Sequence, residues 1–287
     1  MYEIVNKNGF KWYIRKGVPT DREPLRDYEE FVLEACIKAI DSSETFVDVG
    51  ANVGKYAIQL SPRCKQVVAY EPLPENLEVL YKNIELNDIR NVTVREVAVG
   101  SRNGKAYLTR AYAQSKIIDS PKSNTIEVEM VTLDDDLKHY EKISLIKVDV
   151  EGYELEVLKG AMRITREHKP IWVIEHNGYW FDKNDLNHVK IARILVKEGY
   201  LPFAIDTVHW IYVPKNKKHH VIDYVFPYHI FYTVIVPNLR NGKPWYYGVP
   251  DNWWHGMSIL EFIYHVNFKR DWVLYSRSIK ESLGISI

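Results

Sequence analysis

The chain has 287 residues, which suits one large α/β domain or one domain with a substantial appendage. Hydrophobic residues make up 46% and charged residues 26%, so there is enough apolar material for a core in an ordinary soluble protein. Lysine plus arginine and aspartate plus glutamate both number 38, and this neutral balance argues against a general nucleic-acid binder, which carries a basic excess.

The two cysteines, Cys36 and Cys64, are too few for a disulfide framework, and we interpret them as small buried side chains in a reducing cytosol. The first residues alternate polar and apolar side chains and contain no hydrophobic segment of a secretory signal. No run approaches the roughly 18 apolar residues of a membrane helix. These features predict a cytoplasmic protein without a membrane span.

The predicted elements begin with a short strand at 9–16 and a helix at 27–40, after which strands and helices alternate. Further strands are predicted at 45–50, 66–71, 92–99, 143–150, 170–176, 200–205 and 229–237, and helices at 54–60, 74–87, 153–161 and 185–199. A hairpin is expected from segments 105–111 and 125–133. The alternation implies an α/β fold with a mostly parallel sheet and helices on both faces. Its ligand site should lie along the edge formed by the strand carboxyl ends.

We divide the chain into three parts. Residues 1–44 are expected to form a strand and helix that pack on the core, 45–237 the alternating domain, and 238–287 a C-terminal aromatic extension. Of the 37 Phe, Trp and Tyr residues, 18 fall in the last 87 positions, so this end is built differently. Its aromatic stretch at 251–255 suits a sugar-stacking surface, the interface of a homo-oligomer or extra core, and the sequence leaves all three open.

The segment "FVDVGANVGKYAIQL" at 46–60 is the first signal of function. Asp48 lies near the end of a hydrophobic strand, and Gly50 and Gly54 bracket the turn into a helix. Glycines are needed there because a Cβ would block the tight turn or the approach of a ligand. The spacing differs from the G-x-G-x-x-G of dinucleotide folds and lacks the Lys-Ser/Thr pair of a P-loop.

A second signal is Glu71, which ends the next strand 21 residues after Gly50. An acid at this place accepts hydrogen bonds from ribose hydroxyls. It also fits a cap on the following helix, and the two roles can coexist. Two loop glycines suit a nucleoside without a pyrophosphate better than NAD. The loop and the acid together therefore indicate S-adenosylmethionine as the cofactor.

Several segments of the chain resemble, in order, those of the FkbM-type methyltransferases. They are "DYEEFVLEA", "FVDVGANVGKYA", "VAYEPLPENLEVLYKNIELN", "VAVG", "VTLDDDL" and "IKVDVEGYELEVLKGA", and the resemblance covers residues 5–205. It implies a class I methyltransferase (Rossmann-like) fold, with a seven-stranded sheet whose last strand is antiparallel and whose final two strands are 200–205 and 229–237. It also makes 45–237 an S-adenosylmethionine-binding methyltransferase domain. The segment after Pro237 matches no part of the family pattern.

The resemblance assigns residues to parts of the cofactor. The glycine loop surrounds the methionine part, Glu71 holds the ribose, and the end of the third strand flanks the adenine. Glu29, in the helix before the first strand, helps to close the pocket. The expected cofactor-binding residues are Glu29, Asp48, Gly50, Asn52, Gly54, Tyr56, Glu71, Pro72, Glu96, Val97, Ala98 and Asp149.

Methyl transfer to a hydroxyl needs a group that removes a proton, and the catalytic candidates Asp149, Glu151 and His176 follow the fourth and fifth strands. Asp149 is expected to face the reacting centre. His176 is the natural general base because imidazole titrates near neutrality, but it also fits a histidine that is only hydrogen-bonded at a strand end. Glu151 also fits a charge at a helix N-terminus. With Glu175 these acids suit Mg²⁺, yet no further spacing supports a metal, and we assign no metal ligands.

The favoured function is O-methylation of a hydroxyl on a sugar, glycan or related small molecule. An RNA methyltransferase is the first alternative. It is opposed by the zero net charge and by the absence of an N-P-P-Y-type motif or of a cysteine nucleophile at a strand end. A non-catalytic cofactor-binding module that acts through the aromatic extension is the second alternative. The intact glycine loop and the acids around Asp149 argue against it.

Overall fold

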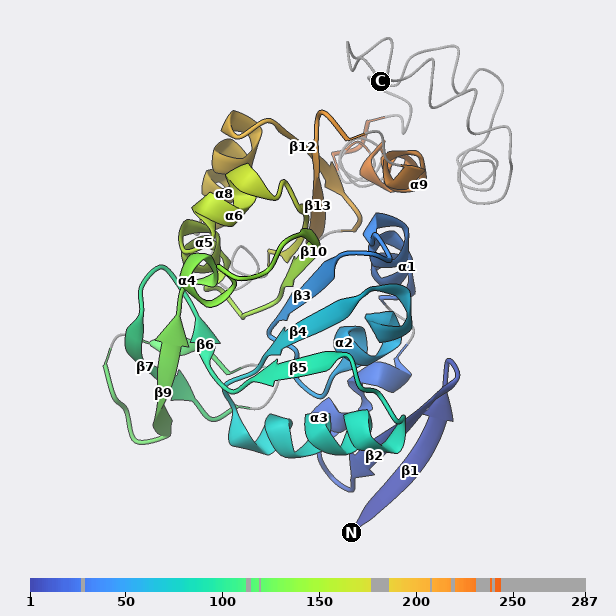
Figure 1. Cartoon of the computed structure of the whole chain (residues 1–287), viewed down its shortest axis with the longest axis vertical. Helices are drawn as coiled ribbons and strands as arrows, with labels where there is room; N and C mark the ends of the chain where they lie inside the picture. The colour runs from blue at the N-terminus through green and yellow to red at the C-terminus, as the bar shows by residue number, and fades with distance from the viewer. Residues whose placement is uncertain are drawn as a thin grey trace.

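A seven-stranded sheet forms the centre of the structure, a computed structural model that describes residues 1–26, 29–111, 115–118, 120–176, 186–206, 208–217, 220–230, 238 and 241–243 (Figure 1). The strand order is β12-β13-β11-β10-β3-β4-β5. The strands are β3 (Thr45–Val49), β4 (Gln66–Tyr70), β5 (Val92–Arg95), β10 (Ile143–Val148), β11 (Ile171–Glu175), β12 (Tyr200–Ala204) and β13 (His209–Pro214). All run parallel except β13, which is antiparallel to both neighbours. This is the mostly parallel sheet that the alternation predicts.

The prediction for the last strand is wrong. We expected it at 229–237, but the antiparallel strand is β13, and 220–230 form the helix α9 (His220–Ile230). Residues 231–237 lie outside the described part of the chain. An apolar run can be read as a strand or as a buried helix, because its periodicity does not separate the two. Pairing decides the matter, since β13 is bonded to both β11 and β12.

Two layers of helices cover the sheet (Figure 1). On one face, called the α1 face below, lie α1 (Glu30–Ala39), α2 (Lys55–Leu60), α3 (Pro74–Leu86) and α9. On the other, called the α8 face, lie α4 (Leu133–Asp136), α5 (Glu154–Lys159), α6 (Met162–Glu167) and α8 (Asn187–Lys197). Side chains alternate along each strand, so Phe46 packs on the α1 face and Val47 on the α8 face. None of the helices in the described part of the chain has the length and apolar composition needed to cross a membrane.

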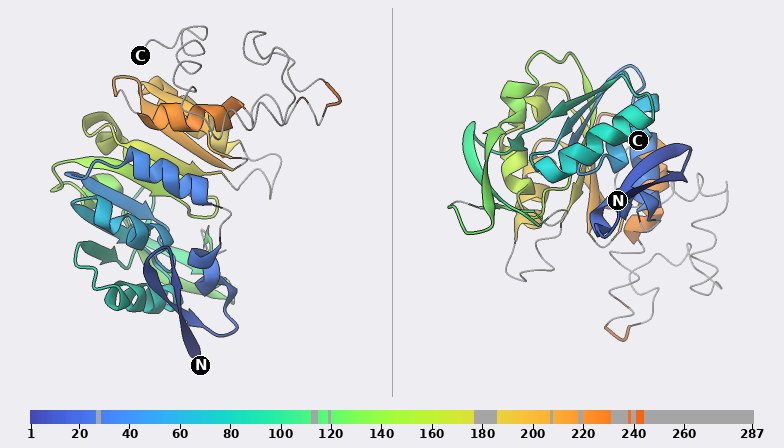
Figure 2. Two further views of the ribbon diagram at one scale, coloured as in Figure 1. Left: turned by 90° about the vertical axis from the view of Figure 1, so that its right-hand side faces the viewer. Right: turned by 90° about the horizontal axis from the view of Figure 1, so that it is seen from below.

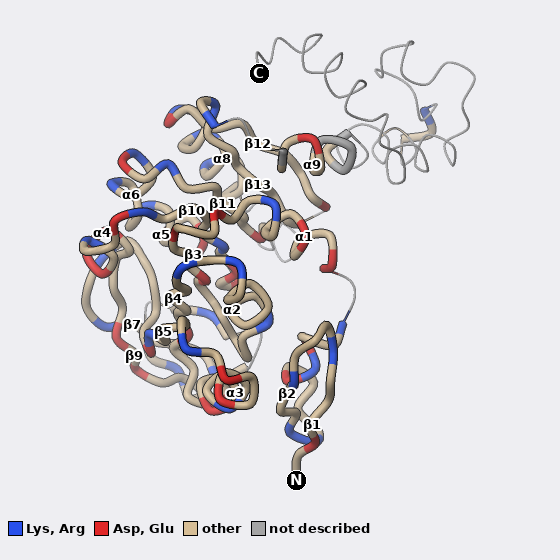
Figure 3. Tube along the Cα trace, turned by 45° about the vertical axis from the view of Figure 1, so that its right-hand side comes forward, with Lys and Arg blue, Asp and Glu red and all other residues tan. Residues whose placement is uncertain are grey.

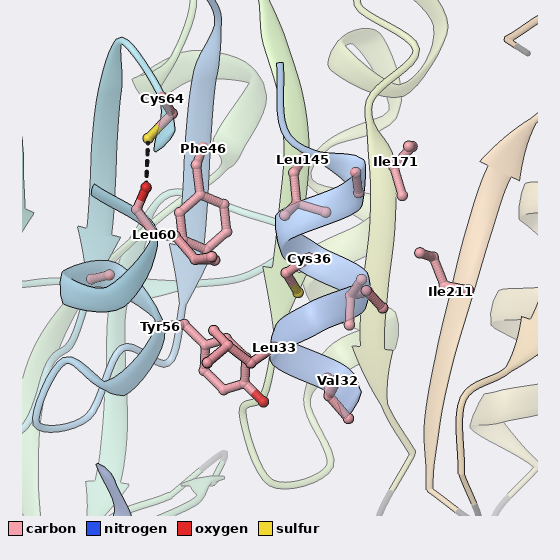
Figure 4. Close-up of a cluster of buried hydrophobic side chains, with 14 of the residues drawn as sticks. Val32, Leu33, Cys36, Phe46, Tyr56, Leu60, Cys64, Leu145, Ile171 and Ile211 are labelled. Atoms are coloured by element: carbon pink, nitrogen blue, oxygen red, sulfur yellow. Dashed lines mark hydrogen bonds between the residues drawn. The ribbon is translucent and has the colours of Figure 1, made fainter. Parts of the chain in front are cut away.

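The core on the α1 face contains both cysteines (Figure 4). Cys36 lies on α1 among apolar side chains that include Phe46 and Leu145, and burial raises the pKa of its thiol to about 12. Cys64 points its Sγ at the carbonyl oxygen of Leu60, 3.5 Å away. Both thiols are free and buried, as the sequence indicates, and both are held in the unreactive protonated form.

The N-terminal part is a hairpin, where we expected one strand. Strands β1 (Tyr2–Lys7) and β2 (Phe10–Arg15) pair along their whole length and are followed by the 3₁₀ helix η1 (Pro19–Leu25). The hairpin lies beside α3 (Figure 2), where Trp12 is buried and the backbone N–H of Tyr13 donates to Asn83 Oδ1 at 2.7 Å. Arg15 pairs with the fully buried Asp21 at 2.8 Å.

A second sheet stands beside the carboxyl edge of the first. Its order is β6-β9-β7-β8, formed by β6 (Ala98–Val99), β7 (Gly104–Thr109), β8 (Ile117–Ile118) and β9 (Thr125–Val131). Strands β7 and β9 form the predicted hairpin, in register from Gly104 with Met130 to Thr109 with Thr125. This sheet supplies Leu108 to the cavity described next.

Candidate active site

A cavity of about 270 Å³ lies at the carboxyl-terminal edge of β3, β4, β10 and β11, where open α/β sheets bind their ligands. Predicted site residues that line it are Glu29, Gly50, Asn52, Tyr56, Glu71, Pro72, Val97, Ala98, Asp149 and Glu151. Its wall also contains Lys55, Asn76 and Lys147, which were not among the predicted site residues, and Glu175, which the sequence suggested only as a companion of Asp149 and Glu151 in the Mg²⁺ interpretation. Predicted residues that do not line it are Asp48, Gly54, Glu96 and His176.

The glycine loop is held between the ends of β4 and β10. The backbone N–H groups of Gly50 and Ala51 donate to the carbonyl oxygen of Tyr70 at 3.0 and 2.9 Å. Gly50 has a φ of +85°, and a Cβ at this position would lie 1.9 Å from the carbonyl oxygen of Asp149. A side chain is therefore excluded both by the backbone conformation and by a wall of main chain.

Asp48 and Gly54 support the loop instead of lining the cavity. Asp48 is buried, and its Oδ2 accepts a hydrogen bond from the N–H of Ala57 in α2 at 3.0 Å. Burial raises the pKa of Asp48 to about 6, although Lys147 acts to lower it. Gly54 caps α2 at a φ of +96°, and a Cβ there would lie 2.7 Å from Leu80 Cδ1. Both residues hold α2 against the strand ends.

Glu71 joins two segments with one carboxylate. Its Oε2 accepts from the N–H of Asn52 and its Oε1 from the N–H of Leu73, each at 2.8 Å. Leu73 is the N-cap of α3, so Glu71 stabilises the start of that helix, as the capping interpretation expects. Burial raises its pKa to about 7. Because Glu71 also lines the cavity, capping and ligand binding are compatible at this position.

Side-chain alternation decides which residues at the end of β11 reach the cavity. Val173 and Glu175 point to the α1 face, whereas Ile174 and His176 point to the α8 face. His176 Nε2 lies 3.0 Å from the hydroxyl of Tyr212, and burial lowers the pKa of His176 to about 3. The geometry therefore gives no support to His176 as the general base and matches the alternative of a hydrogen-bonded histidine at a strand end.

Lys147, Asp149 and Glu175 form a charged group at the cavity wall. Lys147 Nζ donates to Asp149 Oδ2 at 3.0 Å, from a side chain that is only 2% exposed. Burial acts to lower the pKa of Lys147, but Asp149 and other nearby carboxylates raise it above its usual value. Burial acts to raise the pKa of Asp149, but Lys147 and a hydrogen bond with Glu175 hold it well below its usual range. Burial and the charge of Asp149 raise the pKa of Glu175. Of the two carboxyl groups Asp149 is therefore the stronger acid, and Glu175 is the one that keeps its proton longer as the pH rises.

The ends of α1 and α2 close the cavity beside this group. Lys55 Nζ and the Tyr56 hydroxyl both donate to Glu29 Oε2, at 2.8 and 2.9 Å. Burial acts to raise the pKa of Glu29, but the ammonium groups of Lys55 and Lys147 lower it overall, so Glu29 is ionised. The Lys147 ammonium also lies 4.3 Å from the centre of the Tyr56 ring. The pairing of Lys55 with Glu29 and the contact of Lys147 with the Tyr56 ring therefore hold the side chains of this wall in place.

The residues at the end of β5 divide between cavity and solvent. Val97 and Ala98 line the cavity together with Leu108 of the second sheet. Glu96 is exposed, and its Oε1 accepts a hydrogen bond from the hydroxyl of Tyr81 at 2.6 Å. Of these three predicted adenine contacts, only Val97 and Ala98 have a position from which they can reach a bound ligand.

The charged group has no metal-like arrangement. No set of three or more His, Cys, Asp or Glu residues suited to a metal ion occurs in the described part of the chain. Asp149 is paired with the ammonium of Lys147, so the positive charge at this place comes from a side chain. Glu151 lines the cavity from a turn with a φ of +54°. The Mg²⁺ interpretation gains no support from these residues.

The family model described as the methyltransferase FkbM domain matches residues 48–202, which is more than half of the chain. The chain belongs to this methyltransferase family. The match runs from the end of β3 into β12, so it contains the glycine loop, Glu71 and the group of Lys147, Asp149 and Glu175. The resemblance found in the sequence is thereby confirmed, and the strand order agrees with the class I methyltransferase fold that it implies.

Relatives of this FkbM-family chain include two curated methyltransferases. It is 28% identical over 190 residues to methyltransferase sdnD of Sordaria araneosa, covering 52% of this chain and 71% of the relative. It is 26% identical over 152 residues to the hexuronic acid methyltransferase AglP of Haloferax volcanii, covering 52% of this chain and 63% of the relative. A crystal structure of methyltransferase FkbM from Methylobacillus flagellatus KT aligns at 23% identity with a TM-score of 0.45. That alignment covers 60% of this chain and 44% of the other.

Proposed function

We propose that this FkbM-family protein is an S-adenosylmethionine-dependent methyltransferase that methylates a hydroxyl of a sugar, glycan or related small molecule. The observation that carries the proposal is the composition of the cavity. Its wall joins the glycine loop and Glu71 to the carboxyl groups of Asp149 and Glu175. One cavity therefore contains both the residues suited to bind a nucleoside and a carboxyl group able to accept a proton.

The cavity wall fits the cofactor in its hydrogen-bonding groups and in its charge. Asn52 Oδ1 is buried and has no hydrogen-bond partner among the described residues, so the loop has an acceptor to offer to a ligand amino group. The carboxyl side chains of the wall are Glu23, Glu29, Glu71, Asp149, Glu151 and Glu175, and its lysines are Lys55 and Lys147. This acidic excess favours a cation such as a sulfonium. When bound, S-adenosylmethionine supplies the electrophilic methyl group.

The residue roles follow from positions in the wall. We assign Gly50 and Asn52 to the methionine part, Glu71 to the ribose hydroxyls, and Val97 with Ala98 to the adenine. Tyr56, Pro72 and Glu29 are assigned to the surrounding wall. Asp48 and Gly54 act through the loop that they support. Glu96 and His176 receive no direct role, because neither lines the cavity.

Asp149 is our candidate for the proton acceptor. As the new carbon–oxygen bond forms, the acceptor oxygen gains positive charge and its hydroxyl becomes a strong acid, so a carboxylate of low pKa suffices. Lys147 fixes the orientation of Asp149 through their hydrogen bond. Glu151, in the same wall, is assigned to hold the acceptor hydroxyl.

The acceptor class is inferred from charge and from one relative. An acidic wall repels a polyanion such as RNA, and in the view of Figure 3 acidic and basic residues are interspersed along the described chain. AglP is named as a hexuronic acid methyltransferase, which favours a saccharide. A cytoplasmic location, and an oligomer formed through 238–287, stay predictions.

Titration calorimetry with S-adenosylmethionine and S-adenosylhomocysteine tests the cofactor. We expect saturable binding that weakens about tenfold or more in Glu71→Ala, since buried acceptors facing the ribose are lost. Glu96→Ala is the matched control: it removes an acid that we expected in the site but that lies outside the cavity, so affinity should stay within about twofold. No binding by the wild type refutes the enzyme, whereas unchanged binding by Glu71→Ala refutes only the ribose assignment.

Radiolabelled methyl transfer to a panel of neutral methyl glycosides, uronic acid glycosides, glycolipid and tRNA tests the acceptor. We expect transfer to a glycoside, with Asp149→Asn losing turnover while cofactor binding is retained. Transfer to tRNA alone contradicts the proposed acceptor class. Full turnover by Asp149→Asn contradicts the role of that carboxylate.

A further inference from the structure

A buried histidine of β13 lies next to Glu175 without lining the cavity itself. His209 pairs with Glu175 in register and is 3% exposed. Its Nε2 lies 3.9 Å from Glu175 Oε1 and 4.0 Å from Glu29 Oε1. This nitrogen is buried and has no hydrogen-bond partner within the described residues. An unpaired buried polar atom lowers stability, so a purely structural histidine is expected to be better satisfied.

The other ring nitrogen is held by Asp206. His209 Nδ1 lies 2.7 Å from Asp206 Oδ2, while Asp206 Oδ1 accepts from the N–H groups of Val208 at 2.7 Å and His209 at 2.6 Å. Burial acts to raise the pKa of Asp206, but its hydrogen bonds with the His209 ring and with the backbone N–H groups of Val208 and His209 lower it overall. An ionised carboxylate can only accept hydrogen bonds. In the neutral ring the proton therefore lies on Nδ1, and Nε2 presents a lone pair towards Glu175.

We propose that His209, oriented by Asp206, receives the proton of Glu175 during methyl transfer. The inference rests on the proposed function and extends it beyond the cavity. His209 contacts neither reactant, so it is a positioning residue that acts through Glu175. A movement of the Glu175 carboxyl by about 1 Å brings it within hydrogen-bond distance of Nε2.

The proton path balances. The acceptor O–H bond breaks and its proton passes to Asp149, while the oxygen–methyl bond forms and the sulfur–methyl bond breaks. The O–H bond of Glu175 then breaks as the N–H bond at His209 Nε2 forms. The carboxyl pair returns to its state with one shared proton, and the released proton resides on the imidazole.

Four carboxyl groups and a second histidine interact with His209. Asp206 faces Nδ1, and Glu29 lies with Glu175 near Nε2. Asp149 on β10 is a further carboxylate that interacts with His209. His176, on the opposite face, also interacts with His209, and its low pKa keeps it neutral. A proton transferred to Nε2 therefore arrives among carboxyl groups, with Asp206 hydrogen-bonded to Nδ1.

Nitrogen-15 NMR of histidine-labelled protein bound to S-adenosylhomocysteine, recorded near neutral pH, tests the state of the ring. We expect the proton of neutral His209 on Nδ1 in the wild type. In Asp206→Asn the side-chain amide donates to Nδ1, so the ring proton should move to Nε2. His176→Gln serves as the control, since it removes a second buried histidine and should leave the His209 signals in place. A wild-type proton on Nε2 overturns the proposal.

The pH dependence of single-turnover methylation of the active glycoside tests the transfer itself. His209→Asn retains an N–H directed at Asp206 but has no Nε2. We expect this variant and Asp206→Asn to slow transfer about tenfold or more, with affinity for S-adenosylmethionine within about twofold. Both should also change the shape of the pH profile, because the group that receives the proton is removed in one variant and reoriented in the other.

A role in stability alone leaves the shape of the pH profile unchanged, so an unchanged profile or an unchanged rate overturns the proposal. If the wild type binds the cofactor but methylates no glycoside, the proposed function fails. In that case the ring proton measured by NMR still decides whether His209 can accept a proton from Glu175.

Discussion

Replacing Lys147 by methionine tests the charged group at the cavity wall. Methionine keeps most of the volume of the lysine stem within the core but removes the ammonium that lies 3.0 Å from Asp149 Oδ2. Asp149 then loses the ammonium with which it is paired, and Asp48 loses a nearby cation. The change therefore leaves negative charge uncompensated in a buried place.

The expected loss can be worked from the geometry. At 3.0 Å and an effective dielectric constant of about 20, the attraction within the pair of Lys147 and Asp149 is about 5 kcal/mol. Desolvation of the ammonium offsets part of this in the wild type. Breaking a buried pair costs about 3–5 kcal/mol, and the Asp149 side chain is 27% exposed and keeps some hydration. We expect the free energy of unfolding to fall by about 3 kcal/mol at neutral pH.

The pH dependence of this loss has a definite sign. Lys147 holds the folded-state pKa of Asp149 below its value of about 3.9 in an unfolded chain. The stabilisation is therefore present above that pH and is lost as the pH falls through the folded-state pKa. In Lys147→Met the pKa of Asp149 rises, so the difference from the wild type should narrow as the pH approaches about 4.

Urea denaturation followed by circular dichroism measures the free energy of unfolding of the wild type and of Lys147→Met, at neutral pH and at lower pH. The double variant Lys147→Met/Asp149→Asn is the matched control and should recover most of the loss, because the unpaired charge is gone. A difference below about 1 kcal/mol at neutral pH would contradict the pairing, since that is the range of exposed ion pairs. A difference that widens on acidification would contradict it as well.

Three further predictions concern the loop and two titrating groups. Gly50→Ala should lower the free energy of unfolding by more than about 3 kcal/mol, because its Cβ meets a carbonyl oxygen at 1.9 Å. Gly152→Ala, at a position with positive φ but in open space, should lower it by only about 1 kcal/mol. Equal losses in urea denaturation would refute the steric argument. Because burial raises the pKa of Glu71 to about 7, its carboxyl group loses its proton between about pH 6 and pH 8. A cationic ligand should therefore bind more tightly as the pH rises through this range, and its binding should release protons from Glu71. Calorimetry in buffers of different ionisation enthalpy should find this linkage absent in Glu71→Gln. His176 has a pKa lowered to about 3, below the unfolded value of about 6.5, so stability should fall by up to about 1.4 kcal/mol per pH unit on acidification below that value. His176→Gln, which can still bond Tyr212, should remove this slope in acid titrations, and an unaltered slope would show that other groups cause it.

Local patterns were sufficient for the loop and for most of the sheet. The period of the apolar residues places β3, β4, β10 and β11, and the glycines and Glu71 follow strands whose carboxyl ends meet at one edge. The family match over 48–202 confirms that this part was identified correctly. The last strand was misplaced, because an apolar segment after 215 carries the same composition whether it forms a strand or the helix α9.

The assignment of His176 shows a different limit. A strand places neighbouring residues on opposite faces, so Glu175 and His176 cannot both reach the cavity. The sequence shows the alternation but not which face the cavity occupies, which depends on where α1 and α2 pack. Lys147 could be recognised as a candidate site residue, because it is a charged residue within an apolar strand. No feature of the sequence around His209 marks that residue as a neighbour of the site.

The sequence by itself thus determined the α/β alternation through its periodicity, the glycine loop through its motif, and the family through the resemblance of several segments, because these features are encoded over short stretches of chain. Only the tertiary structure decided that Asp149 and Glu175 lie in one cavity wall and that His209 lies beside Glu175. Those residues come from three different strands, and their distances are set by sheet order and by the burial that shifts their pKa values. Neither sheet order nor burial can be read from a single stretch of sequence.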